Sequence, residues 1–231
     1  MGKHANTLKS LVVATVVLVA LSHLYIFMLV PNERVMGAVQ RIFYFHVASA
    51  FACYGAFGVV LVASLMFLVT NRWRSDILSE AAGEVGFVLC SIVLASGMIW
   101  GHSAWNTWFR WEEPRLVTFL VLWLIFLSFT VLRNFGDPTR IAVHSAILGI
   151  LGAASVPLVS LSINFLSARE QLHPKVIEHG GLKDPSYWQA FGISTVTLLA
   201  LAALLIHLRY RIGCAEYLNR MRIMENDSND T

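Results

Sequence analysis

Four of the seven tryptophans in this 231-residue chain fall within a single segment of 12 residues, 100–111. The aromatic side chains considered further are Trp105, Trp108, Phe109 and Trp111. If the segment is helical, the first three share one face through i,i+3 and i,i+4 spacing, and Trp111 extends that face. An aromatic belt at a membrane interface is the simpler interpretation, but a belt usually distributes its aromatic residues over several span ends. The density of the cluster favours a platform for a large, flat, apolar ligand that stacks on aromatic faces.

Histidines occur on both sides of this segment. We single out His46 and His173, because a neutral imidazole is a preferred axial ligand of haem iron. Two such ligands from different loops could clamp a haem over the aromatic platform, although a solvated histidine is the simpler interpretation of each one alone. A zinc site would need three or four ligands including cysteine or carboxylate. The nearby Glu112 and Glu113 make zinc possible but not favoured.

Two arginines accompany these groups. Arg41 precedes His46 by five residues, and Arg115 follows the aromatic segment. Either arginine could anchor the chain at a membrane interface. Alternatively, the guanidinium groups could pair with anionic groups such as the two propionates of a haem.

The rest of the chain must position these residues, and its composition indicates how. Hydrophobic residues make up 57% of the chain and charged residues 13%, against about 25% charged residues in a typical soluble domain. This composition excludes a disordered protein and predicts an all-α, polytopic membrane protein, with residues 1–231 forming a single integral membrane domain. Because about 20 apolar residues cross a bilayer, we expect six transmembrane helices. Their predicted spans are 11–30, 47–70, 85–101, 116–132, 141–165 and 187–208, the first being a retained signal anchor.

Six spans place both termini on one side of the membrane. That side carries ten of the 17 lysines and arginines, and the opposite side carries seven. The positive-inside rule therefore predicts cytoplasmic termini. The segments 31–46, 102–115 and 164–186 then face outward, and 102–115 is the outward-facing tryptophan-rich loop. No run of basic residues indicates a nucleic-acid surface, so we expect membrane lipid and no nucleic acid among the partners.

Three separated blocks of the sequence resemble the CcmC family, part of the haem-handling group of WWD-domain proteins that also includes CcsA-type proteins. The block at 41–47, RIFYFHV, resembles the family's block around a first axial histidine. The block from Trp100 to Leu116 resembles the WWD motif. The block Leu172-His173-Pro174 resembles the end of the block around a second axial histidine. The resemblance covers most of the chain.

The sequence departs from the family pattern at several positions. Phe109 replaces the second tryptophan of the usual pair. Glu112 stands for the usual acidic residue, and Glu113 is an additional residue. The interval before His173 is longer than usual, so His179 is the alternative second ligand.

The resemblance implies a cargo, a location and partners. Haem b would be presented at the outer, periplasmic face of the cytoplasmic (inner) membrane. It would pass to a CcmE-like haem chaperone for cytochrome c maturation, with CcmA-, CcmB- and CcmD-like subunits of an ABC transporter complex. This is haem delivery and transport rather than classical enzyme chemistry, and no residue is assigned a catalytic role. The haem-binding residues of this hypothesis are His46, His173, Trp105, Trp108, Phe109, Trp111, Arg115 and Arg41, of which the two histidines are the metal ligands.

Two other classes of function stay open at this point. A cytochrome b-like electron-transfer subunit would hold haem between histidines in the middle of its spans, where only His23 clearly lies. A cofactor-free transporter or structural subunit would use the tryptophan-rich loop as a belt or a docking surface. A CcsA-type rather than a CcmC-type pathway, and the role of Glu112, also stay open.

Overall fold

The computed structural model of this chain describes residues 2–137, 140–165 and 182–229. Six stretches within these ranges are helical, long and apolar enough to cross a membrane, and the same ranges contain no β-strand. The prediction of an all-α, polytopic membrane protein with six transmembrane helices is therefore confirmed. The α-helices are α1 Gly2–Met28, α2 Arg41–Thr70, α3 Trp73–Trp105, α4 Pro114–Phe135, α5 Ile141–Ala154, α6 Val156–Leu161 and α7 Pro185–Asn229, and short 3-10 helices occupy Ala38–Gln40 and Ser162–Phe165.

The helices extend beyond the apolar runs that predicted them. α2 begins at Arg41 rather than at 47, α3 begins at Trp73 rather than at 85, and α7 continues to Asn229 rather than ending at 208. Hydropathy marks only the part of a helix that must lie in hydrocarbon, whereas polar residues continue the same hydrogen-bonded helix outside that part. The fifth predicted span is interrupted at Ser155, because Pro157 lacks the N–H that a continuous helix needs.

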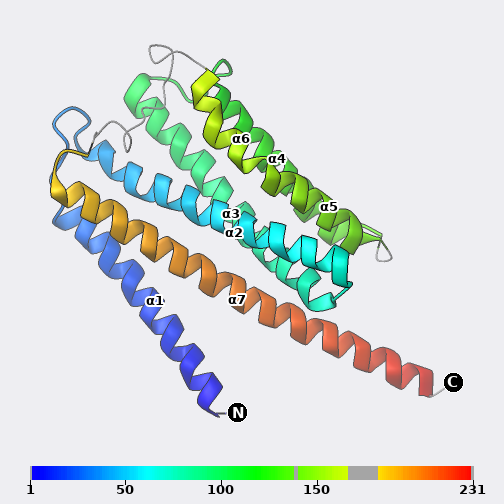
Figure 1. The fold of residues 1–231 in the computed structure, drawn as a ribbon. Helices are drawn as coiled ribbons and strands as arrows, with labels where there is room; N and C mark the ends of the chain where they lie inside the picture. The colour runs from blue at the N-terminus through cyan, green and yellow to red at the C-terminus, as the bar shows by residue number, and fades with distance from the viewer. Residues whose placement is uncertain (1, 138–139, 166–181, 230–231) are drawn as a thin grey trace.

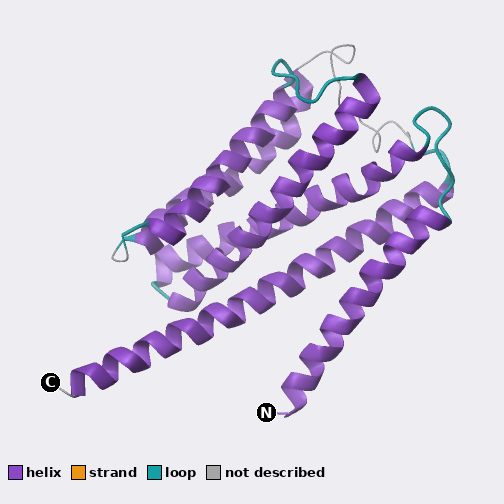
Figure 2. Cartoon of the chain, turned by 180° about the vertical axis from the view of Figure 1, so that it is seen from behind, coloured by secondary structure: helices purple, strands orange, loops and turns teal. Residues whose placement is uncertain are grey.

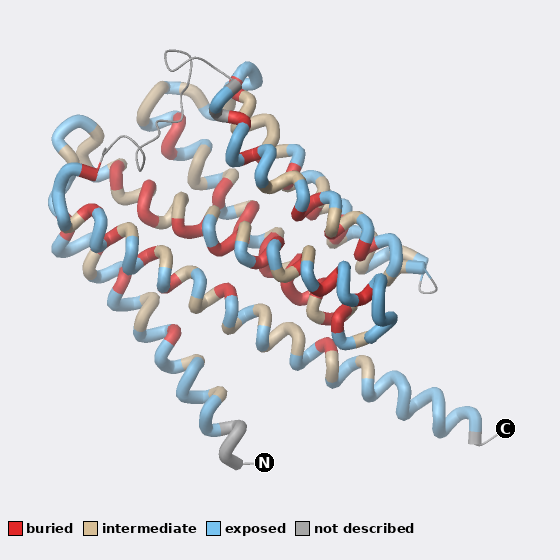
Figure 3. Tube along the Cα trace, in the orientation of Figure 1, coloured by how far each residue is buried: buried red, intermediate tan, exposed pale blue. Residues whose placement is uncertain are grey.

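The helices α2 and α3 form the centre of the bundle. α2 contacts α3, α5 and α7, and α4 contacts both α3 and α5. α1 packs against α7 and diverges from the bundle toward its N-terminus (Figures 1 and 2). Buried residues concentrate on α2 and α3 (Figure 3). Both termini lie at one end of the bundle and the loop between α3 and α4 lies at the other (Figure 1).

A glycine of α3 allows α2 and α3 to approach closely in the core. The ring of Phe57 on α2 stacks on the ring of Phe126 on α4, with centroids 3.5 Å apart. Gly86 of α3 lies directly against Phe57, because a Cβ added at Gly86 would be 2.5 Å from the Phe57 ring. Small residues are common where membrane helices pack backbone to backbone. Any side chain at Gly86 must therefore displace the stacked rings.

The Gly86→Val variant is expected to lose about 1–3 kcal/mol of stability, the usual cost of overpacking a core. Thermal unfolding of the purified protein in detergent measures this loss. Gly58→Val on α2 is the matched control, since a Cβ at Gly58 meets nothing within 4 Å. Equal melting temperatures for the two variants would contradict the close packing of α3 on Phe57.

A network of charged side chains ties α3, α4 and α7 together at the end of the bundle that carries the termini. The Nη2 of Arg133 on α4 donates to the carboxylate and to the carbonyl of Asp76 on α3, both at 2.8 Å. Arg209 on α7 donates to both oxygens of Glu84 on α3, at 2.6 and 3.0 Å. Glu80 lies between the two arginines, 3.8 Å from Arg133 and 3.6 Å from Arg209. The network holds α4 and α7 against α3 at this end of the bundle. The predicted site residues of α2 and of the loop between α3 and α4 lie at the opposite end.

Candidate functional site

The imidazole of His46 is held between α2 and α3. His46 lies five residues after the start of α2 and is half-buried. Its Nδ1 is 3.0 Å from the hydroxyl oxygen of Ser96 on α3. Its ring also packs against Gly97, since a Cβ at Gly97 would be 3.0 Å from Cε1 of His46. Ser96 and Gly97 of α3 therefore both contact this ring, and the backbone carbonyl of Val93 on the same helix is a further partner of it.

Arg115 brings a positive charge to the same part of the bundle. It lies in the first turn of α4, where Pro114 favours the start of a helix because its fixed φ suits the first position. The guanidinium of Arg115 interacts electrostatically with His46 and with Tyr54, which lies further along α2. The fold thus places the charge of Arg115 within electrostatic range of His46, although the two residues are far apart in the sequence.

The tryptophan-rich segment is not the continuous helix that would place its aromatic residues on one face. α3 ends at Trp105, and Asn106 adopts a left-handed conformation with φ of 55°. The N–H of Asn106 donates to the carbonyl of His102 at 3.0 Å. Asparagine tolerates this conformation, which commonly ends a helix. The loop between α3 and α4 is therefore 106–113, inside the segment 102–115 that was predicted to face outward, and it carries Trp108, Phe109 and Trp111.

The aromatic side chains instead meet in pairs at the end of α3 and in the loop. Trp108 and Trp111 stay 55% and 69% exposed, so much of each ring surface is available to a ligand. The pairs are Trp100–Trp105 with ring centroids 5.0 Å apart, His102–Trp108 at 4.2 Å and Phe109–Trp111 at 4.8 Å. The rings of His102 and Trp108 are stacked, and the rings of the other two pairs meet edge to face.

Trp100 belongs to this region, although it was not among the residues predicted for the site. It is 5% exposed, and its indole N–H has no acceptor among the described residues. A buried donor left without a partner costs about 1–3 kcal/mol, so an acceptor brought to this indole N–H would relieve that cost. Trp100 lies one helical turn beyond Ser96, the residue that contacts His46. Its position in the tryptophan-rich segment was visible in the sequence, but its burial depends on helix packing.

Comparison with known proteins assigns the chain to a family. A family model described as CcmC, heme exporter protein C, matches residues 2–224. This chain belongs to the CcmC family. The resemblance found in the three sequence blocks is confirmed by this match.

Individual relatives cover different shares of the chain. The chain is 33% identical over 168 residues to heme exporter protein C of Bradyrhizobium diazoefficiens, a match that covers 72% of this chain and 63% of that protein. It is 26% identical over 208 residues to heme exporter protein C of Escherichia coli K12, covering 87% of this chain and 84% of that protein. The match to heme exporter protein C of Paracoccus denitrificans is 33% identical over 59% of this chain and 57% of that protein. The chain thus matches less than two thirds of the Bradyrhizobium and Paracoccus proteins.

The two acidic residues of the CcmC-like motif differ in burial. The side chain of Glu112 is 76% exposed and pairs with Arg110 at 3.7 Å. Glu113 is only 1% exposed and precedes the first turn of α4, where the helix dipole favours a carboxylate. The buried acid of this CcmC-family chain is therefore Glu113, the residue that is additional to the usual pattern.

Arg41 contacts Phe27 of α1 and the residue Val30 just after α1. Its Nη2 donates to the carbonyl of Val30 at 3.3 Å, and its guanidinium lies 5.9 Å from the centre of the Phe27 ring. These contacts hold the end of α1 against the start of α2. The role of Arg41 toward a propionate stays a prediction. The predicted second ligand His173 and its alternative His179 lie outside the described residues.

His23 is the mid-span histidine that would bind haem in a cytochrome b-like subunit, and it is exposed on α1. Its Nδ1 lies 2.8 Å from the carbonyl of Val19 one turn earlier. Its ring stacks on Phe45 of α2, with centroids 4.6 Å apart. The contacts of His23 are therefore those of a helix–helix packing residue.

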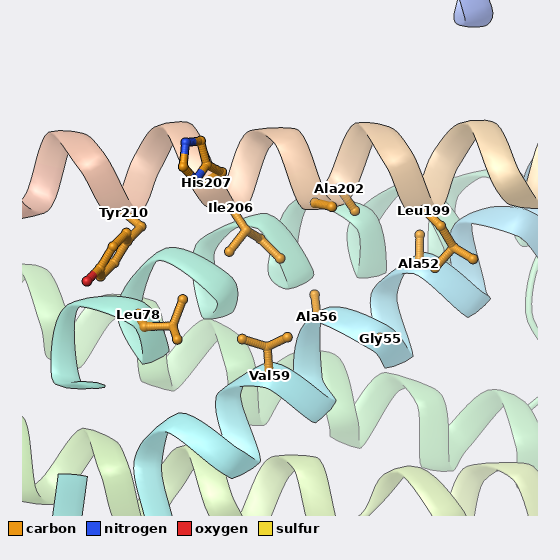
Figure 4. A pocket seen from close by; sticks show the side chains of 11 residues that line it. Ala52, Gly55, Ala56, Val59, Leu78, Leu199, Ala202, Ile206, His207 and Tyr210 are labelled. Atoms are coloured by element: carbon orange, nitrogen blue, oxygen red, sulfur yellow. The ribbon is translucent and has the colours of Figure 1, made fainter. Parts of the chain in front are cut away.

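An apolar groove lies elsewhere in the bundle, between α2, α3 and α7 (Figure 4). Its volume is about 420 Å³, and small and aliphatic side chains make up most of its wall. His207 and Tyr210 stand at one end of it (Figure 4). The other lining residues are Ala52, Gly55, Ala56, Val59, Leu78, Leu199, Ala202, Ala203 and Ile206. The groove contains none of the predicted site residues and is separate from the site around His46.

Proposed function

We propose that this chain binds haem as its cargo at the outer face of the cytoplasmic membrane and delivers it to a CcmE-like haem chaperone for cytochrome c maturation. Membership of a family described as heme exporter protein C supports the handling of haem. The observation that carries the proposal is the position of His46 and Arg115 together, at the end of the bundle that also exposes the aromatic rings of the loop 106–113.

The residues present fit the chemical features of haem. The iron accepts a nitrogen ligand, which His46 supplies. The propionates are carboxylates, which accept hydrogen bonds and pair with cations. The buried N–H of Trp100 would donate a hydrogen bond to a propionate, and the guanidinium of Arg115 would pair with one. The flat porphyrin gains from contact with aromatic rings, which Trp108 and Trp111 expose. Bound haem would supply the iron, and the chain's own residues would bind and orient it.

A second axial ligand, the type of haem and the partner proteins complete the proposed function. His173 is the proposed second axial ligand, with His179 as the alternative, and haem b is the proposed cargo. We place both termini in the cytoplasm and CcmA-, CcmB- and CcmD-like transporter subunits beside this chain. A site at the end of the bundle supports delivery, because a partner protein can reach the edge of a haem there. A site in the middle of the membrane would be closed to such a partner.

The Arg115→Gln variant is expected to bind haem more weakly than the wild type. A charge-assisted hydrogen bond contributes about 1.5–3 kcal/mol, and about 1.4 kcal/mol corresponds to a tenfold change in the dissociation constant. The dissociation constant should therefore rise about tenfold or more, because glutamine keeps a donor but loses the charge. Titration of the purified, haem-free protein with haemin, followed by absorbance, gives this constant.

Arg110→Gln is the matched control for this titration. Arg110 lies in the loop close to Arg115 in sequence, but its side chain is 44% exposed and pairs with Glu112. Its replacement should leave the dissociation constant within about twofold, because exposed ion pairs contribute little. Equal weakening by the two variants would show that net charge alone attracts haem, and would count against a propionate contact at Arg115.

A further inference from the structure

We propose that Ser96 is the positioning residue that fixes the tautomer and the orientation of His46, so that its Nε2 is the nitrogen offered to the haem iron. This inference rests on the proposed function, in which His46 is an axial ligand. It assigns a role to a residue on a different helix, 50 positions away in the sequence.

The Ser96 hydroxyl has a single proton, which it can donate either to its own helix or to His46. The Oγ of Ser96 is 2.6 Å from the carbonyl oxygen of Ile92, one turn earlier on α3. The carbonyl oxygen of Val93 lies 3.3 Å from the same Oγ. A carbonyl oxygen can only accept, so the Ser96 hydroxyl donates its proton to its own helix. This is the usual back-bonding of a serine within a helix.

The direction of this hydrogen bond decides which nitrogen of His46 carries a hydrogen. With its proton donated to α3, the oxygen of Ser96 can only accept from His46, whose Nδ1 is 3.0 Å away. The Nδ1 of His46 therefore carries the hydrogen. In a neutral imidazole only one ring nitrogen carries a hydrogen, so Nε2 is left with a free lone pair. A lone pair on this nitrogen is what an axial iron ligand needs.

Another serine of α3 shows the same arrangement with an unambiguous donor. The hydroxyl of Ser91 donates to the carbonyl of Phe87 at 2.9 Å. The same oxygen accepts from the indole Nε1 of Trp123 on α4 at 2.8 Å. Because an indole nitrogen can only donate, the accepting role of Ser91 is certain. Ser96 stands in the same relation to its own helix and to a ring of a neighbouring helix.

Gly97 restricts the ring in a second way. A Cβ at Gly97 would lie 3.0 Å from Cε1 of His46, 3.6 Å from Nδ1 and 3.9 Å from Nε2. The ring edge that contains these atoms is therefore packed against the backbone of α3. A flip of the ring would replace the Nδ1–H beside Ser96 with a carbon and lose the hydrogen bond. The hydrogen bond therefore selects between the two ring orientations, and the packing against Gly97 limits how far the ring can tilt.

The consequence for the haem site is a more basic and better oriented ligand. A hydrogen bond from the remote ring nitrogen to an acceptor raises the basicity of a metal-binding histidine, and its loss typically costs about 10–100-fold in metal affinity. A more basic ligand stabilises ferric over ferrous iron. Removal of the Ser96 hydroxyl should therefore weaken haem binding and shift the reduction potential of bound haem to more positive values.

The test compares three variants with the wild type. Ser96→Ala removes the acceptor, Ser96→Thr retains a hydroxyl that can bond the same carbonyl, and Ser91→Ala removes the equivalent hydrogen bond to Trp123. The first readout is the ¹⁵N NMR signal of His46 in haem-free protein, assigned with His46→Gln, because the two tautomers give distinct shifts. The second and third readouts are the haemin dissociation constant and the midpoint potential of the haem-bound protein.

The wild type and Ser96→Thr should show the Nδ1–H tautomer, whereas Ser96→Ala should show a mixture of tautomers. Ser96→Ala should bind haemin about tenfold more weakly and with a more positive potential, and Ser91→Ala should match the wild type in all three readouts. A wild-type tautomer and potential in Ser96→Ala would overturn the inference. If haem binding does not depend on His46 at all, the proposed ligand fails, while the NMR readout still decides whether Ser96 fixes the tautomer.

Discussion

The His46→Ala variant should be purified with less than about a tenth of the haem that the wild type carries. Changes in the second shell of a metal site already cost about 10–100-fold in affinity, and the loss of the ligating nitrogen itself is expected to cost at least as much. Arg115 and the exposed rings of Trp108 and Trp111 would remain, but they provide no bond to iron. Haem content per protein, measured as the pyridine haemochrome, gives the result.

His23→Ala is the matched control for this experiment. His23 is exposed on α1 and bonds a carbonyl of its own helix, so its removal should leave the haem content unchanged. Equal haem content in the His46→Ala variant and the wild type would remove His46 from the ligand set. Loss of haem in both variants would instead support the cytochrome b-like arrangement that uses mid-span histidines.

The second large effect is expected from Arg133→Ala, at the opposite end of the bundle. The side chain of Arg133 is 4% exposed and bonds Asp76, while Glu80 lies 3.8 Å away. Removing one partner of a buried ion pair leaves an uncompensated charge, which typically costs about 3–5 kcal/mol. The side chains of Asp76 and Glu80 are 20% and 26% exposed. We therefore expect a loss near the lower figure, about 3 kcal/mol.

Thermal unfolding in detergent and the yield of folded protein both report this loss. Arg211→Ala is the control, because Arg211 is exposed on α7 near the same end of the bundle. Exposed substitutions of this kind usually stay within about 0.5 kcal/mol. If Arg133→Ala and Arg211→Ala unfold at the same temperature, the network does not hold α3 and α4 together as the geometry indicates.

The six membrane helices were predictable because hydropathy reports the part of each helix that must lie in hydrocarbon. Their ends were not, because the ends depend on local backbone geometry. Asn106 ends α3 through a left-handed conformation, and this change removes Trp108 from the helical face that i,i+3 spacing predicted. Similarly, Pro157 in the fifth apolar run divides it into α5 and α6.

The candidate site could be predicted from the sequence where the residue type itself suggests the chemistry, as for a histidine or an arginine. It could not be predicted where a residue's contacts depend on how the helices pack. His46 and Arg115 were proposed from residue type and position, and the fold brings the charge of Arg115 within electrostatic range of His46. Their role toward haem stays a prediction. Ser96 carries no signal in the sequence, because only the packing of α2 on α3 brings it to Nδ1 of His46. Arg41 has the same residue type as Arg115, but only the fold shows that it contacts the Phe27 ring of α1 and the carbonyl of Val30 just after α1.

The central claim is that the imidazole of His46 is an iron ligand, and replacement of that imidazole by a free one tests it most directly. The His46→Gly variant, purified without haem, is mixed with haemin in the presence and absence of imidazole, and the Soret spectrum is recorded. We predict that the variant alone lacks the wild-type spectrum and that added imidazole restores it, because free imidazole can occupy the vacated ligand position. A wild-type spectrum without imidazole, or no recovery when imidazole is added, would contradict the assignment of His46 as the ligand.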